Sequence, residues 1–293
     1  WYRGEELFCA TSAPEGEGWE QDNDVLDTWF SSGLWTFTPL GWPNATDDLK
    51  QYHPTTPIET GYDILPFWVA RMILMSGFFL GQVPFKTIYF HGLVRDGQGR
   101  KISKSLGNNI DPVDMADKYG MDAIRISLIA GMAPGTDSRI SEDKIRGYKH
   151  FANKLWNISR FVLTSLGDAT PSDETKLTID DNALLAELNE LTKTVDTHFT
   201  TYRIDLASDA IYQYLWKRFA DEIIEESKPI LGGSDADAIR SRQRILVTIL
   251  KTSLKLLHPF MPFVTEAVWQ NIPKEIRSDE HDILMVAKWP KVS

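Results

Sequence analysis

The spacing of apolar residues divides the chain near residue 145, because helices and a strand alternate before that point and only helical spacing follows it. The apolar run over 64–79 predicts a helix, and the short β-branched and aromatic run over 86–90 predicts a buried strand. Asp111-Pro112 then predicts the start of a short helix that Gly120 ends. Such alternation is typical of an α/β layer.

The later part of the chain has a helical pattern throughout. Asp122 is expected to cap a helix over 123–130, and Ser141 begins a long helix with one apolar stripe. The expected stripe consists of Ile145, Tyr148, Ala152, Leu155, Trp156, Val162 and Leu166. Further helices are predicted over 183–198, 204–227 (ended by Pro229), 236–257 and 262–272, with a break at 232–234. The predicted fold is therefore α/β followed by an all-α antiparallel bundle, with domains over 1–145 and 146–293.

Composition and charge narrow the class of protein. The 293 residues are 42% hydrophobic and 25% charged, which is typical of a soluble globular protein of about two domains. With 31 Lys and Arg against 41 Asp and Glu, the net charge of −10 excludes a generally basic nucleic-acid coat. The single cysteine, Cys9, excludes an internal disulfide and a multi-cysteine zinc site, and it favours a reducing, cytoplasmic compartment.

The longest apolar stretch, over 64–80, is interrupted by Pro66 and Arg71. We expect a buried helix there rather than a membrane span, and therefore no membrane partner. The chain begins at Trp1 within sequence of ordered character, which suggests a piece of a longer protein.

The stretch over 95–108, here called the lysine loop, carries the most specific chemistry. It reads R-D-G-Q-G-R-K-I-S-K-S-L-G-N and follows the predicted strand. Lys101 and Lys104 are three residues apart and separated by a small hydroxyl residue, so both can reach one polyphosphate. The alternative for a lysine pair alone is an ordinary solvated turn.

The string K-I-S-K-S-L-G-N resembles the signature loop of class I aminoacyl-tRNA synthetases, with Ile102 in place of the usual methionine. The stretches over 24–32, 61–72 and 258–263 are similar to the valyl-tRNA synthetase family within that class. The resemblance implies the second half of a Rossmann-like catalytic domain, followed by an anticodon-binding helical bundle.

The resemblance also implies roles for individual residues. Catalytic roles fall to Lys101, Ser103 and Lys104, with the two lysines on the β- and γ-phosphates of ATP. The implied ATP-binding residues are Gly61, Asp63, His91, Gly92, Ile102 and Lys104. The implied walls of the amino-acid pocket are Trp29, Ile64 and Trp68.

Plainer interpretations stay open for several of these side chains. Trp29 and Trp68 could be core aromatics, and Asp63 could cap the apolar helix that follows it. His91 could be a satisfied histidine at the end of a strand. The remaining histidines have no metal-like spacing, so no metal ligand is predicted.

The implied reaction joins valine and ATP to valyl-adenylate and then transfers valine to tRNA(Val). Magnesium is expected with the ATP but receives no protein ligand, and a monomer is expected. No H-x-G-H sequence is present, so that motif and the proofreading domain are expected outside this chain, which alone would be inactive. The alternatives are a tRNA-binding module only, or the same portion of an isoleucine or leucine enzyme. For Lys154, Trp156 and Arg160, packing within the bundle is favoured over RNA contact.

Overall fold

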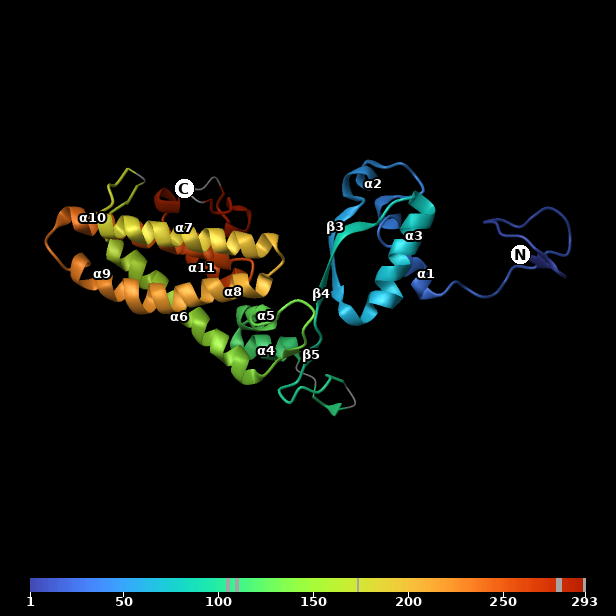
Figure 1. The fold of residues 1–293 in the computed structure, drawn as a ribbon, viewed down its shortest axis with the longest axis horizontal. Helices are drawn as coiled ribbons and strands as arrows, with labels where there is room; N and C mark the ends of the chain where they lie inside the picture. Colours follow the sequence, from blue (N-terminus) through green and yellow to red (C-terminus); the bar gives the residue numbers. More distant parts are fainter. Residues whose placement is uncertain (104–105, 109–110, 173, 278–280, 292–293) are drawn as a thin grey trace. The chain divides into compact units, whose positions relative to one another are not determined.

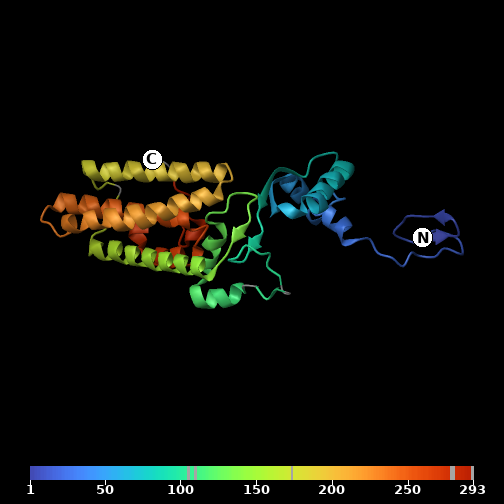
Figure 2. The same ribbon diagram turned by 60° about the horizontal axis from the view of Figure 1, so that its bottom comes forward.

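The computed structural model divides into two compact units, Trp1–Tyr89 and Phe90–Ser293. Figures 1 and 2 show their elements coloured along the sequence. The structure describes residues 1–103, 106–108, 111–172, 174–277 and 281–291.

The first unit combines short strands with helices. Its elements are β1 (Tyr2–Arg3), β2 (Glu6–Leu7), α1 (Thr28–Gly33), η1 (Thr38–Leu40), α2 (Asp47–Tyr52), β3 (Thr55–Gly61), η2 (Tyr62–Ile64), η3 (Leu65–Val69), α3 (Ala70–Leu80) and β4 (Phe85–His91), which continues into the second unit. β1 pairs with β2, and β3 is the hydrogen-bonded neighbour of β4. The strand predicted over 86–90 is thus confirmed as β4.

The core of the first unit is largely aromatic. Phe37 is fully buried and packs edge-on against Trp42, with ring centroids 5.3 Å apart, while Phe79 lies 5.0 Å from Trp42. The ring of His53 is also buried in this core, and its Nδ1 lies 3.1 Å from the carbonyl oxygen of Thr36. The unit therefore has a small core of its own.

The long apolar stretch is helical as predicted, over Tyr62–Leu80, but it is not the buried helix we expected. Within the described residues, this stretch is long and apolar enough to cross a membrane by length and composition, and only 17% of it is buried. Met72 faces the core, whereas Leu74 and Phe78 are 71% and 82% exposed. The reason is that α1 and the aromatic core cover only one side of α3.

The second unit consists mainly of helices (Figure 1). After β4 its elements are β5 (Val94–Arg95), α4 (Pro112–Tyr119), α5 (Met121–Ile129), β6 (Ser138–Arg139), α6 (Glu142–Leu166), α7 (Ile179–Thr200), α8 (Ile204–Gln213), η5 (Tyr214–Ile223), α9 (Ile224–Leu231), α10 (Ala236–Leu257), α11 (Pro262–Asn271), α12 (Lys274–Arg277) and η6 (Leu284–Val286). β5 pairs with β6 in parallel.

The predicted helical bundle is confirmed, with α10 at its centre. α10 packs against α6, α7, α9 and α11 (Figure 2). Apolar side chains of α10, such as Ile245 and Leu250, are fully buried. A helix that is apolar on several sides requires this central position.

Two of the predicted helix caps are confirmed. The side chain of Asp111 accepts a hydrogen bond from the Val113 N–H at the start of α4, and Ser141 Oγ accepts one from Lys144 at the start of α6. These bonds satisfy backbone donors that have no partner inside the helix.

The prediction for Asp122 is wrong. α5 begins at Met121, and the Asp122 carboxylate instead accepts from the N–H groups of Phe263 and Val264, at 3.1 and 2.6 Å. Asp122 therefore caps α11, whose own N-cap residue, Met261, provides no side-chain bond. Sequence spacing could not indicate a cap supplied from more than 100 residues away.

Two smaller predictions about the bundle are also wrong. Pro229 lies inside α9 rather than beyond its end, because the helix runs two residues further to Leu231. Trp156 is 44% exposed, and Ile158 takes a place in the buried stripe of α6 instead. Consecutive helical residues point about 100° apart, so Trp156 cannot share the core direction of Leu155.

Candidate functional site

The turn that leads into the lysine loop requires a glycine at residue 92. A Cβ at Gly92 would lie 1.7 Å from the carbonyl oxygen of Thr136, closer than any two such atoms can approach. The 133–137 segment therefore packs directly on the backbone at the end of β4. This close approach gives Gly92 a structural reason that is independent of any ligand.

Ion pairing holds the base of the lysine loop. Asp137 Oδ1 accepts from the Leu93 N–H at 2.9 Å, and its other oxygen accepts from the Arg95 guanidinium. Arg95 lies on β5, beside β6. The carboxylate of Asp137 is thus bonded to the residues that begin the loop.

The described part of the loop presents one lysine to solvent. Lys101 is exposed, and the described residues offer it no acidic partner. Ile102 is half-buried against the cluster around Tyr119 and Ile124. The Ser103 N–H donates to Asn108 Oδ1 at 3.0 Å. Lys104, the other predicted catalytic lysine, lies outside the described residues.

His91 is half-buried at the end of β4. Its Nδ1 lies 2.9 Å from the carbonyl oxygen of Gly92, which fits the plainer interpretation of a strand-end histidine. A contact between His91 and a nucleotide stays a prediction.

In the first unit, Gly61, Asp63 and Ile64 follow one another where β3 ends. Gly61 is buried and precedes η2, whereas Asp63 is exposed. The alternative role of Asp63 as a cap is not supported, because η2 and η3 start without a side-chain cap bond and the described residues give the Asp63 carboxylate no hydrogen-bond partner. Its oxygens face solvent and can accept from a ligand.

The two predicted tryptophans lie on neighbouring elements, α1 and η3. Asp27 begins α1 by accepting from the Trp29 N–H at 2.7 Å, and Trp68 Nε1 donates to the carbonyl oxygen of Ser32 at 3.0 Å. Trp68 lies in a π-helical turn, a wide turn that often marks functional sites. Both indoles are half-buried, so neither is an ordinary core aromatic.

Two neighbours that the sequence did not single out support Trp29. The Phe67 ring lies 6.2 Å from the Trp29 ring, and the Arg71 guanidinium lies 5.5 Å from its centroid. The spacing of Phe67 and Arg71, four residues apart on one helical face, was the signal available in the sequence.

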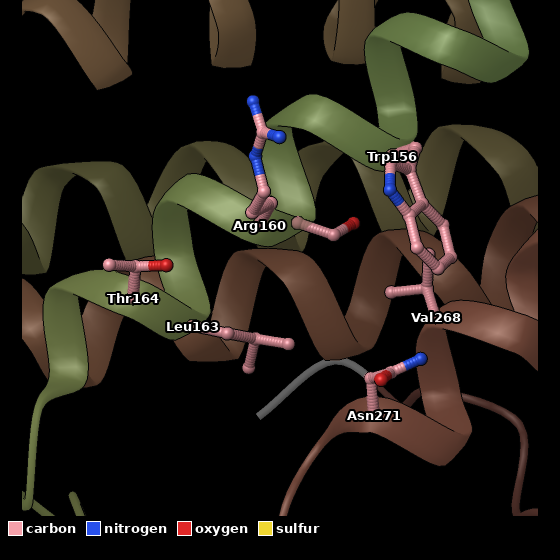
Figure 3. A pocket seen from close by; sticks show the side chains of 7 residues that line it. Trp156, Arg160, Leu163, Thr164, Val268 and Asn271 are labelled. Atoms are coloured by element: carbon pink, nitrogen blue, oxygen red, sulfur yellow. The ribbon is translucent and has the colours of Figure 1, made fainter.

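A third group of residues lines an open pocket of about 350 Å³ between α6 and α11. Its lining includes Trp156, Arg160, Leu163, Thr164, Val268 and Asn271, shown in Figure 3. Trp156 and Arg160 are exposed, and no acidic side chain among the described residues pairs with Arg160. Lys154, by contrast, contacts Asp221 at 2.6 Å and the Trp216 ring, as expected for packing in the bundle.

Metal binding by the protein finds no support in the residues that the structure describes. They contain no group of three His, Cys, Asp or Glu side chains placed to hold a metal ion.

Comparisons with known proteins identify the family of the chain. Residues 5–141 match the family of class I tRNA synthetases (I, L, M and V), and residues 181–293 match the anticodon-binding domain of tRNA ligases. The LeuRS–tRNA–LeuAMS complex of Agrobacterium radiobacter K84 shares the fold, with a TM-score of 0.72 over 96% of this chain and 35% of that one, at 18% identity. Methionyl-tRNA synthetase of Mycobacterium tuberculosis bound by methionyl-adenylate gives 0.68 over 87% and 52%, at 26% identity. The chain therefore belongs to the class I aminoacyl-tRNA synthetases.

Curated relatives narrow the class further. The chain is 47% identical to the valine–tRNA ligase of Bacillus cereus, over 100% of this chain and 33% of that protein. It is 47% identical to that of Bdellovibrio bacteriovorus over 86% of this chain and 29% of that protein. The chain belongs to the valyl-tRNA synthetase family and spans about a third of the length of these relatives.

Proposed function

We propose that this chain is part of a valine–tRNA ligase, which activates valine with ATP and transfers it to tRNA(Val). The observation that carries the proposal is the 47% identity to valine–tRNA ligases over the whole chain, lysine loop included. Residues 1–145 would complete the catalytic domain, and residues 146–293 would form the anticodon-binding domain. The family resemblance also implies a monomer, which light scattering on the complete protein would test.

In the first step, the valine carboxylate attacks the α-phosphorus of ATP, and the bond to pyrophosphate breaks. Lys101 and Lys104 hold the β- and γ-phosphates and stabilise the negative charge that moves onto the leaving group, while the Ser103 hydroxyl adds a hydrogen-bond donor. One donor placed in this way contributes about 3 kcal/mol to the transition state. The exposure of Lys101 and its lack of an acidic partner among the described residues support this role.

The nucleotide would be held by backbone and side-chain groups around the two strand ends. Asp63 would accept from the ribose hydroxyls, a role supported by its exposed carboxylate. His91, Gly92 and the backbone of Ile102 would line the adenosine site. Gly61 would allow the nucleotide to approach the backbone closely. The half-buried Ile102 side chain supports this role, because it leaves the backbone as the part that can meet the base.

Trp29, Ile64 and Trp68 would form the walls of the valine pocket. The half-buried indoles leave part of their apolar surface exposed, which suits contact with a small branched side chain. The bond from Trp68 to Ser32 supports this proposal, since it ties the two walls into one framework.

The pocket between α6 and α11 supports tRNA binding by the bundle. Unpaired anticodon bases can stack on an exposed Trp156 and bond to Arg160 or Asn271. Residues 146–293 carry 19 basic and 21 acidic side chains, so RNA is repelled less there than by residues 1–145, which carry 12 and 20. This pocket also favours the second candidate function, a tRNA-binding module that works without the catalytic half.

Valine-dependent exchange of pyrophosphate into ATP tests the proposal in the complete protein. Lys104→Ala should slow exchange by about 100-fold and leave tRNA affinity nearly unchanged, because the lysine acts on the leaving group. Lys193→Ala, at an exposed lysine of the bundle, is the matched control. Normal exchange in Lys104→Ala would refute the catalytic assignment, and exchange that depends on isoleucine or leucine would refute the valine specificity.

Sequencing the tRNA that this chain retains at low salt tests the module. Enrichment of valine isoacceptors that Trp156→Ala abolishes would support anticodon recognition through the pocket. Binding that is insensitive to salt would contradict contact with phosphates.

A further inference from the structure

A buried carboxylate lies at the base of the lysine loop. Asp96 is only 7% exposed, and its Oδ1 accepts from the backbone N–H groups of Gln98 and Arg100, at 3.0 and 2.8 Å. Its Oδ2 accepts from Arg100 Nε at 2.8 Å and from Asn108 Nδ2 at 2.9 Å. These bonds, that of Asn108 foremost, hold the pKa of Asp96 well below its usual range. Asp96 is therefore a fixed anchor for the loop.

Asn108 connects this anchor to the catalytic stretch. Besides its bond to Asp96, its Nδ2 donates to the carbonyl oxygen of Lys101 at 3.1 Å, and its Oδ1 accepts from the Ser103 N–H at 3.0 Å. One side-chain amide thus holds backbone groups on both sides of Ile102. The orientation of each peptide group from Lys101 to Ser103 follows from these two bonds.

The amide at residue 108 suits this position and a carboxylate does not. Asn108 donates to two oxygens and accepts from one N–H, so it needs both ends of an amide. An aspartate there would place two carboxylates about one hydrogen bond apart, and alanine would leave all three groups without this partner. The charged group bonded to Asp96 is Arg100, and the Arg139 guanidinium lies beside Gly99.

We propose that Asn108, anchored by Asp96, is a positioning residue for adenylate formation that sets the backbone from Lys101 to Ser103 before ATP binds. This inference rests on the proposed function, because it assumes that the stretch acts on ATP. The pair touches no substrate and acts through the groups that it orients. Misplacing such groups by about 1 Å can slow a reaction about 100-fold.

Two substitutions in the complete protein test the inference. Asn108→Ala should lower kcat for valine-dependent exchange by about 100-fold and leave the KM for valine within about two-fold, because the valine walls lie on other elements. Asn108→Asp should lose as much at high pH and recover as the pH falls, since two facing carboxyls raise the pKa of one of them. Once protonated, the introduced carboxyl can donate to Asp96 as the amide does.

Asn182→Ala is the matched control, since this exposed amide also bonds to backbone carbonyls, of Leu177 and Thr178 in the bundle. Asn182→Ala should leave the rate of valine-dependent pyrophosphate exchange unchanged. The inference is overturned if Asn108→Ala keeps kcat within two-fold, or if Asn108→Asp and Asn108→Ala lose activity in the same ratio at every pH.

Amide hydrogen exchange over 101–103 separates this inference from the proposed function. Asn108→Ala should speed exchange of the Ser103 amide by at least ten-fold, whichever amino acid the enzyme activates. An unchanged rate of amide hydrogen exchange at Ser103 would refute the positioning role, even in an enzyme that is active with valine. Faster amide hydrogen exchange at Ser103, in a protein whose parent is inactive with valine, would refute the proposed function and leave the structural role of Asn108 in place.

Discussion

Asp122→Ala should destabilise the bundle, because it removes the cap of α11. Asp122 accepts from the N–H groups of Phe263 and Val264, and it is only 6% exposed. Loss of a helix cap costs about 1 kcal/mol, and leaving two partly buried N–H groups without this partner adds about as much. We therefore expect the free energy of unfolding to fall by about 2 kcal/mol.

The pH dependence of stability provides a second readout at the same residue. Burial raises the pKa of the Asp122 carboxyl above its ordinary 3.8, although the bonds from Val264 and Phe263 lower it, as do the nearby Arg125 and His258. Because the folded-state pKa is the higher one, the associated stability is complete below the unfolded pKa and is lost as the pH rises through the folded pKa. Asp122→Asn, which is neutral at every pH, should remove this decline.

Urea unfolding followed by circular dichroism, between about pH 3 and pH 7, measures both effects. Asp117→Ala on α4 is the matched control, because this exposed aspartate should change stability by less than about 0.5 kcal/mol. The reasoning is refuted if Asp122→Ala is as stable as the control, or if Asp122→Asn declines with pH as steeply as the parent.

Three further substitutions test other parts of the chain. Gly92→Ala should abolish pyrophosphate exchange and destabilise the protein, because the added Cβ would lie 1.7 Å from a carbonyl oxygen. A parent-like thermal melt followed by circular dichroism, together with near-parent exchange activity, would contradict this. Arg242→Leu should lower the free energy of unfolding in urea by about 3–5 kcal/mol, since it removes the cationic partner that lies 2.7 Å from the buried Asp181 carboxylate. Asp181→Asn in the same background should recover part of the loss. Arg71→Gln should raise the KM for valine about two- to five-fold through the lost contact with Trp29, whereas Arg71→Lys should raise it less.

Local signals predicted most of the secondary structure. The proline and aspartate at 111–112 and the serine at 141 act within a few residues, so the starts of α4 and α6 were readable from the sequence. The helix predicted over 236–257 has those bounds as α10. A cap, an apolar period and a glycine stop are all properties of neighbouring residues, and the chain satisfies them locally.

The remaining features depend on contacts between distant residues. Asp122 looked like a cap for its own helix, yet its partners are at 263 and 264. Trp156 fitted the apolar stripe by residue type, but it lies at an open pocket beside side chains of α11. The spacing of apolar residues within α6 could not predict where the side chains of α11 lie. The bond between Asn108 and Asp96 joins side chains twelve positions apart in the sequence, and neither helical nor strand periodicity predicts it.

The charges around the lysine loop differ from the net charge of the first part of the chain, and this difference bears on the proposed binding of ATP. Residues 1–145 carry 20 acidic side chains against 12 basic ones, which by itself would repel ATP. Near the loop, however, Asp96 is bonded to Arg100 and Asp137 to Arg95. Because these acids already have cationic partners inside the protein, Lys101 keeps its charge directed at solvent. The geometry of these few pairs, rather than the net charge of the chain, therefore determines the local field that a triphosphate would meet.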